Sequence, residues 1–113
     1  MQHASLDSVE PFTTKDGSTI RELHHTAVQS LAEALLEPGQ ATQRHYHAKT
    51  EEIYLVTAGS GVLEIDGESQ TVGAGDAVLI PPGAWHELVA ADEGVRLLCM
   101  CVPPYSHDDT YFT

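Results

Sequence analysis

The chain has 113 residues, the usual size of one domain with a core of modest thickness. It carries 17 Asp and Glu against 5 Lys and Arg, a formal net charge of -12, so it lacks the basic patch that nucleic-acid binding needs, and an anionic membrane surface would repel it. No apolar run approaches the roughly 18 residues that cross a bilayer, and the first residues do not form a secretion signal, so we expect a soluble, cytoplasmic protein.

The first segment with a clear pattern is VQSLAEALLE, residues 28–37. Its Ala, Leu and Glu content favours a helix on propensity alone. Its alternation also fits a strand, with Leu31, Glu33 and Leu35 on one face, and Pro38-Gly39 ends the element. Because tertiary contacts often override propensity, we predict a strand here and keep the helix as the alternative.

Turn signals recur through residues 50–104 at intervals of ~8–12 residues. These signals are Gly59 and Gly61, Asp66-Gly67, Gly73 and Gly75, Pro81 to Gly83, Gly94, and Pro103-Pro104. The runs between them, EIYLVT, GVLEID, AVLI, HELVA and VRLLCMCV, are rich in residue types that strands favour. Asp66-Gly67 is the pair that a tight hairpin prefers. The pattern predicts an all-β domain, a sandwich or a barrel, with a turn at each signal.

The chain shows no internal repeat or linker, so we expect one domain over residues 1–113. Its two ends, residues 1–12 and 103–113, look peripheral and partly loose. Its two cysteines, Cys99 and Cys101, lie two positions apart in an apolar run, near the limit of disulfide geometry on a strand. We expect reduced thiols that pack in the core, rather than thiols that line a pocket.

The segment RHYHAKTEEIY, residues 44–54, brings two histidines and two glutamates close together. On a strand, His45 and His47 point to the same side, at a spacing from which both can reach one cation. Glu51 falls on that face if the strand runs unbroken, whereas Glu52 needs a bulge or a turn within AKT. Parity alone does not choose between the two glutamates.

A third histidine, His86, follows the turn at Pro81 to Gly83 and starts the next apolar run. Three imidazoles and one carboxylate suit one divalent transition metal such as Fe, Mn, Co, Ni or Zn, whereas Ca and Mg prefer more oxygen ligands. Four protein ligands in an octahedral arrangement leave two positions free, which is typical of catalysis or ligand capture rather than of a structural site. The HxH pair alone is weak evidence, and the third histidine strengthens it only together with a wider resemblance.

These residues resemble the cupin superfamily, whose first motif reads G(X)5HXH(X)3-4E(X)6G and whose second reads G(X)5PXG(X)2H(X)3N. The first motif is matched throughout from Gly39 to Gly59, with QATQR before the histidine pair. The second is matched from Gly75 to His86, and its last position holds Ala90 where the motif has Asn. That departure leaves the metal ligands intact.

The resemblance implies an all-β, single-domain antiparallel β-barrel of the cupin or jelly-roll type, usually a homodimer. The metal ligands that it implies are His45, His47, Glu52 and His86. It decides for Glu52 because the motif requires six residues between the glutamate and Gly59. The metal-site core would then span about residues 39–90.

Several residues near the implied ligands are candidates for other roles. Tyr54 lies at even spacing from the metal-binding glutamate and should point into the barrel, where it either contacts a bound substrate or merely packs. Gln43 shares the histidine face and is a candidate substrate contact. Arg44 and Tyr46 face the other way by parity, toward the surface or a dimer contact. Trp85 should pack outside the site, where a subunit interface would favour an aromatic side chain.

The leading hypothesis of function is a metal-dependent enzyme that acts on a small molecule. A divalent metal with three neutral imidazoles and one carboxylate has a net charge of about +1, which would attract an anionic, chelating substrate. Dioxygenase, isomerase, decarboxylase and lyase activities occur in the superfamily, and the sequence does not choose among them. The alternative is a non-catalytic module that binds a small molecule or sugar, or senses a metal. No unassigned Asp or Glu lies near the ligands in sequence, which favours that alternative and leaves the catalytic residues unassigned.

Overall fold

The computed structural model describes residues 1–113 and contains nine β-strands and one short 3-10 helix. The elements are β1 (Phe12–Thr13), β2 (Thr19–His25), β3 (Ser30–Leu36), β4 (His45–His47), β5 (Glu51–Ile65), β6 (Glu68–Gly73), β7 (Ala77–Ile80), β8 (His86–Val102), η1 (His107–Asp109) and β9 (Thr110–Phe112). No helix is long and apolar enough to cross a membrane. The predicted all-β fold class is confirmed.

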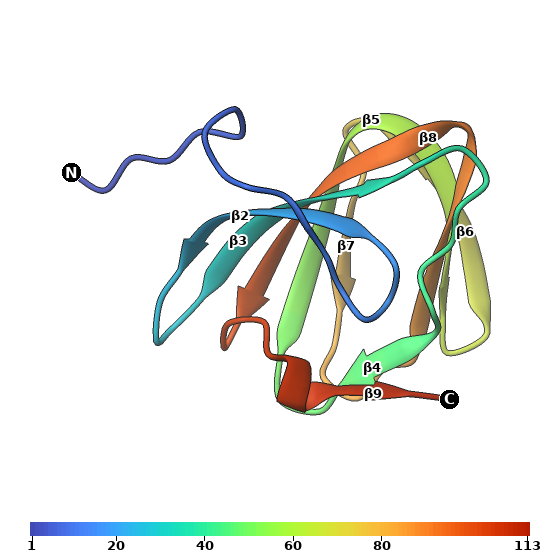
Figure 1. Cartoon of the computed structure of the whole chain (residues 1–113). Coiled ribbons are helices and arrows are strands. Elements are labelled where there is room, and N and C mark those ends of the chain that lie inside the picture. Colours follow the sequence, from blue (N-terminus) through green and yellow to red (C-terminus); the bar gives the residue numbers. More distant parts are fainter.

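The strands pair only in the antiparallel sense, and β8 is the central strand. One path through the sheet is β1-β2-β3-β8-β4-β9, while β5 pairs with β6, β7 and β8. Figure 1 shows the sheet curled into a barrel, with β4 and β9 together at one end and the N-terminal segment extending away from it. The predicted barrel is therefore present.

The ambiguous segment at residues 28–37 is a strand, as predicted, although it begins at Ser30 rather than at Val28. This strand, β3, pairs with β2 along one edge and with β8 along the other. Backbone hydrogen bonds on both edges explain why the strand prevails over the helix propensity of its Ala and Leu residues.

The turns predicted at Gly59, Gly61 and Gly94 are wrong, because β5 and β8 run through these positions as long bent strands. Their register shifts between Val56 and Ala58 and again between Gly59 and Gly61. Gly59 and Gly94 have φ angles of 72° and 77°, and a Cβ atom at Gly59 would collide with the carbonyl of Gly94. Glycine therefore marks bulges where two bent strands approach each other closely, and a bulge has the same local signal as a turn.

Two other predicted turns are present. Asp66 and Gly67 have φ angles of 49° and 89° and join β5 to β6, as the left-handed backbone of a tight hairpin requires. The turn at residues 81–83 connects β7 to β8 and makes His86 the first residue of β8. This second turn brings a histidine from the second half of the chain to the barrel interior.

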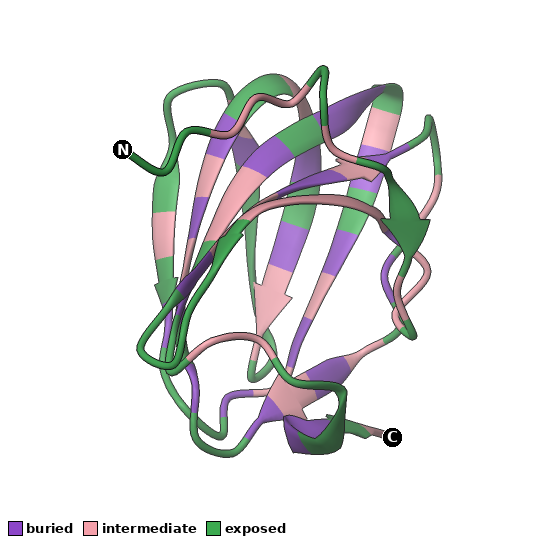
Figure 2. Ribbon diagram, turned by 60° about the vertical axis from the view of Figure 1, so that its left-hand side comes forward, coloured by how far each residue is buried: buried purple, intermediate pink, exposed green.

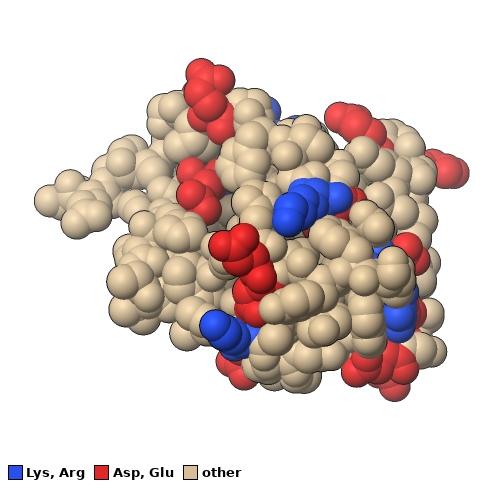
Figure 3. Space-filling model, turned by 60° about the horizontal axis from the view of Figure 1, so that its bottom comes forward, with Lys and Arg blue, Asp and Glu red and all other residues tan.

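Apolar side chains from β3, β5, β7 and β8 form the core, among them Leu36, Val56, Leu63, Ile80 and Leu97. Figure 2 shows buried residues alternating with exposed ones along these strands, as expected when one face of a sheet lies inside a barrel. The surface is acidic. Figure 3 shows the carboxylate side chains in several separate places on one face, with few Lys or Arg between them.

The two chain ends, both expected to be peripheral, differ in the structure. Residues 1–11 form no strand. By contrast, β9 pairs with β4 in the register His45↔Phe112, Tyr46↔Tyr111 and His47↔Thr110. The C-terminal segment is therefore part of the barrel, because it supplies β4 with a hydrogen-bonded neighbour.

Candidate metal centre

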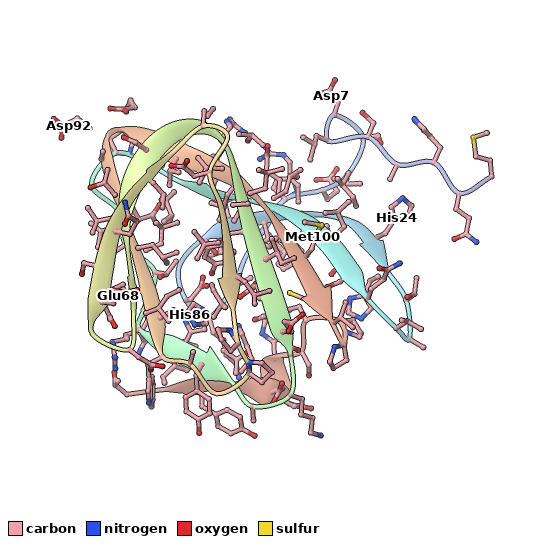
Figure 4. All side chains as sticks on the ribbon, turned by 180° about the vertical axis from the view of Figure 1, so that it is seen from behind. Asp7, His24, Glu68, His86, Asp92 and Met100 are labelled. Atoms are coloured by element: carbon pink, nitrogen blue, oxygen red, sulfur yellow. The ribbon has the colours of Figure 1, made fainter.

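Four buried polar side chains from three strands meet inside the barrel. They are His45 and His47 of β4, Glu52 of β5 and His86 of β8, none more than 5 % exposed. His45 and His86 are partners in the β4–β8 pairing, and alternation along β4 places His47 on the same side. The ligand nitrogens of the three histidines lie within 4.8 Å of one another, and Figure 4 shows His86 inside the barrel beside β4. The residues chosen from the sequence are thus neighbours in space.

Each of these histidines is oriented by a backbone carbonyl. The Nδ1 atoms lie 2.6 Å from the Gln43 carbonyl oxygen for His45, 3.2 Å from that of Asp109 for His47, and 3.0 Å from that of Ala84 for His86. A carbonyl only accepts, so each Nδ1 carries the hydrogen and each Nε2 keeps its lone pair. This is the orientation that second partners give to metal-binding histidines.

Glu52 joins the cluster because the chain bends after β4, which reverses the parity and leaves Glu51 exposed. One oxygen of Glu52, Oε1, lies 3.6 Å from Nε2 of both His47 and His86. This Oε1 and the Nε2 of His86 are buried and have no hydrogen-bond partner. Unpaired buried polar atoms are costly, and one cation between them would satisfy both. The donor set therefore fits a divalent transition metal.

The protonation states also suit a metal. Burial, followed by the charge of His86, lowers the pKa of His45 to about 4. Burial would raise the pKa of Glu52, but the interaction with His86 and the charge of His47 outweigh it, so this pKa is lowered overall. At neutral pH the cluster therefore offers a neutral imidazole at His45 and an ionised carboxylate, the forms that bind metals.

Asp16, which sequence reasoning did not select, reaches the cluster from the turn before β2. Its Oδ2 lies 3.8 Å from Nε2 of His45. Its Oδ1 accepts hydrogen bonds from the Thr14 hydroxyl at 2.6 Å and from the Ser18 amide and hydroxyl at 2.9 Å and 2.7 Å. The sequence TKDGS signals a turn, but nothing local shows that this turn folds over the barrel interior. The site thus contains a carboxylate beyond the predicted ligands.

A cavity of about 50 Å³ adjoins the cluster, enough for a few water molecules or part of a small ligand. It is lined by 20 residues, 11 of them hydrophobic. The polar part of its wall includes Asp16, Thr42, His45, His47, Glu52 and Tyr105, and the apolar part includes Ile20, Ala34, Leu36, Leu88 and Leu97. A ligand in this cavity would touch polar groups beside the histidines and hydrocarbon elsewhere.

Cys101 is buried in the core and Cys99 packs against it, as predicted, but both also line the same cavity, which the prediction did not favour. Both are free thiols, as predicted. They face inward because Cys99 pairs with Tyr54, and Cys101 with Glu52, across the β5–β8 ladder. The Cys101 thiol donates to Oε2 of Glu52 at 3.3 Å. Burial and the charge of Glu52 raise the pKa of both thiols, which keeps them protonated.

The two candidate substrate contacts lie in different places. Tyr54 is buried and lines the cavity, with its ring 6.1 Å from that of His86, and burial raises the pKa of its hydroxyl well above the usual value. Gln43 is exposed and does not line the cavity, because β4 begins only at His45 and the alternation does not extend back to it. Thr42 lies on the cavity wall instead. Gln43 contacts the site through its backbone, because its carbonyl holds His45 and its amide donates to the carbonyl of Asp16 at 2.7 Å.

The residues expected outside the site do lie outside it. Arg44 forms an ion pair with Glu64 at 2.7 Å and lies over the ring of Trp85. Tyr46 contacts Trp85 edge-on and stacks on Tyr111 of β9. This outer aromatic contact holds β9 against β4 from the side opposite to the histidines.

The C-terminal segment supports His47 from behind. The carboxylate of Asp109 accepts hydrogen bonds from the amides of Ala48 and Lys49 at 3.1 Å and 3.0 Å. The carbonyl of the same residue holds Nδ1 of His47, and Thr110 lies 3.3 Å from that nitrogen. Sequence reasoning missed Asp109 because SHDD reads as an exposed polar stretch and its partners lie about 60 residues away.

Comparisons with known proteins agree with this geometry. Residues 32–103 match the family model described as the cupin domain. An uncharacterised protein of Methanocaldococcus jannaschii is 42 % identical over 110 residues, which cover 92 % of this chain and 88 % of that protein. Gentisate 1,2 dioxygenase 1 of Aquipseudomonas alcaligenes is 36 % identical over 55 residues, 49 % of this chain but only 16 % of the dioxygenase.

Among solved structures, a Streptomyces protein, PAC13, determined with uridine, superposes with a TM-score of 0.85 at 18 % identity. The superposition covers 100 % of this chain and 91 % of that one. At such an identity the likeness concerns the fold, and it confirms the predicted jelly-roll barrel.

Proposed function

This chain belongs to the cupin family, and from that premise we propose that it binds one divalent transition metal through His45, His47, Glu52 and His86 and acts as an enzyme on a small molecule. The observation that carries the proposal is the pair of unpaired buried atoms, Oε1 of Glu52 and Nε2 of His86, in a cluster of histidines whose Nε2 atoms are all free of backbone partners. A bound metal there would supply a Lewis acid, or a centre that binds oxygen, with positions left open for a substrate.

Asp16 supports catalysis over mere binding. The sequence alone shows no acid or base near the ligands, whereas the structure brings this carboxylate to within 3.8 Å of His45, on the cavity wall. A carboxylate there can accept a proton from a bound molecule. Tyr54 of β5 also lines the cavity and can form a hydrogen bond to the same molecule, and the apolar wall excludes water from the rest of that molecule's surface.

The reaction class is a further part of the proposal. The stretch shared with gentisate 1,2 dioxygenase 1 supports a dioxygenase, and an isomerase remains the second choice for the same ligand set. If the iron-loaded protein is an oxygenase, it should consume oxygen with an enediol, diketone or phenolic substrate. A metabolite that binds tightly and is recovered unchanged after long incubation would instead identify a non-catalytic binding module.

Elemental analysis of protein purified without added metal tests the metal site. We expect about one metal ion per chain in the wild type and a loss of most of it in Glu52→Gln and His86→Ala. Glu51→Gln removes the neighbouring exposed carboxylate and is the matched control, which should keep its metal. An unchanged metal content in Glu52→Gln would show that the ligand set is wrong.

We also propose that the protein is cytoplasmic and that it forms a homodimer, the assembly that the resemblance to cupins implies. The outer face of β5, β7 and β8 supports this proposal because it exposes Leu79, Met100 and Val102. Light scattering during size-exclusion chromatography would measure the mass, and Met100→Lys should yield monomers if that face is the interface.

A further inference from the structure

We propose that the cavity selects a neutral small molecule that donates a hydrogen bond to Asp16, and that the same residue excludes anions. This inference deepens the proposed metal-dependent function and rests on it. It also replaces the anionic substrate that the ligand set alone favours.

The first support is the balance of charge around the cavity. No Lys or Arg lines it, whereas three carboxylates do, those of Asp16, Glu22 and Glu52. A divalent metal with one carboxylate ligand carries a net charge of about +1, and the charge of Asp16 beside it reduces this to about zero. An anion entering the cavity would meet no cationic side chain, and the carboxylates of Asp16 and Glu52 would already balance the charge of the metal.

The second support is the way in which Asp16 is held. Its Oδ1 already accepts the three hydrogen bonds from Thr14 and Ser18, so the carboxylate cannot turn freely. Its Oδ2 makes no such bond and lies on the side of His45. The free oxygen is therefore fixed beside the proposed metal position, where it can accept a hydrogen bond from an O–H or N–H group of a bound molecule.

The carboxyl of Asp16 accepts three hydrogen bonds and donates none, which is the pattern of an ionised carboxylate. The remaining wall offers hydrocarbon from side chains such as Ile20, Ala34 and Leu97. The ligand that fits is thus uncharged, with a donor group near the metal and an apolar portion beyond it.

Ligand binding to the cobalt(II)-loaded protein tests this inference without any assay of turnover. Azide serves as an anionic probe and imidazole, at pH 8, as a neutral probe that carries an N–H donor. The visible spectrum of cobalt(II) reports binding of either one. The variant is Asp16→Asn, because its amide oxygen can keep the bonds from Thr14 and Ser18 while its NH₂ group replaces Oδ2. Asp92→Asn is the control for net charge, since Asp92 lies at the end of the barrel away from His86 (Figure 4).

We expect Asp16→Asn to bind azide at least about tenfold more tightly than the wild type and to bind imidazole more weakly. Asp92→Asn should match the wild type for both probes. Equal changes for azide and imidazole, or no change for either, would overturn the selection by Asp16 while cobalt uptake still supported the metal site. Failure of the wild type to take up cobalt would overturn both proposals.

A measurement on the wild type alone covers the case in which Asp16→Asn does not fold. Formamide and formate have nearly the same shape and differ in charge. Formate is the better ligand for free cobalt(II), so a protein that binds formamide at least as tightly as formate supports the inference. A clear preference for formate would contradict it.

Discussion

The two ends of the chain are both short polar segments in the sequence, but only the C-terminal one is bonded to the barrel. Residues 1–8 hydrogen-bond only among themselves, through contacts between Ser5, Asp7 and Ser8. Residues 103–113 reach three separate parts of the barrel: β4 through the β9 ladder, the bend at residues 48–49 through Asp109, and β3 through the bond from the Tyr105 amide to Ser30. Only one of the two ends contributes to the histidine cluster.

The difference lies in burial of charge. Asp109 is only 9 % exposed, and a carboxylate that leaves water must find hydrogen-bond partners. Its partners are backbone amides next to a metal-ligand candidate, so satisfying this one acid also fixes the position of His47. The polar residues of the N-terminal segment stay in water and need no such partners.

Deleting residues 107–113 should have the largest effect. It removes the ladder to β4, the contact of Phe112 with His45 and all bonds of Asp109. We expect the free energy of unfolding to fall by about 3 kcal/mol or more, with loss of the bound metal. Thermal unfolding and elemental analysis measure these effects. An unchanged metal content in the truncated chain would show that the C-terminal segment supports the histidine cluster no more than the N-terminal segment does.

Acid should destabilise the folded metal-free protein through the histidine cluster, which the C-terminal segment covers. The pKa of His45 is about 4 in the folded chain against 6.5 for the free side chain, so between these values the unfolded chain binds a proton that the folded chain does not. The stability of the metal-free protein is therefore full above pH 6.5 and falls as the pH drops from 6.5 to 4, by at most about 3 kcal/mol for this group. The lowered pKa of Glu52 adds a loss of the same sign.

Urea unfolding of the metal-free protein across this pH range measures how steeply the free energy of unfolding falls as the pH drops. The chain without residues 107–113 should show a shallower fall, because removal of Phe112 exposes His45 to water. An equally steep slope in both chains would show that the segment does not govern the burial of His45.

The variant Asp109→Ala isolates one residue of the C-terminal segment. It leaves the carbonyl that holds His47 but removes the acceptor for the amides of Ala48 and Lys49. We expect a loss of about 1–3 kcal/mol in stability and about tenfold in metal affinity. The neighbouring exposed residue supplies the control Asp108→Ala, and equal metal affinities in the two variants would count against a positioning role for Asp109.

Deleting residues 1–8 should have the smallest effect. Because this segment bonds only to itself, we expect stability to change by less than about 0.5 kcal/mol and metal content to stay the same. A large loss in either quantity would show that the N-terminal segment has a role that its contacts do not reveal.

The features that could be predicted from the sequence are those that depend on residues close together in the chain. Alternation gave the shared side of His45 and His47, and the turn before His86 placed that residue at a strand start. The continuity of β5 and β8 could not be predicted, because the collision that excludes a side chain at Gly59 involves Gly94, far away in sequence. Asp16 and Asp109 were missed for the same reason, since each sits in an ordinary polar turn until the barrel closes around it.

The pairing of β4 with β9 also has a consequence for the order of events during synthesis. The histidine pair of β4 leaves the ribosome more than 60 residues before Asp109 and Phe112, the residues that hold and cover it. Pairing over such a separation is slow, because loop closure must precede any gain from contacts. The cluster is therefore incomplete until β9 pairs with β4, and the proposed metal site would form only in the finished barrel.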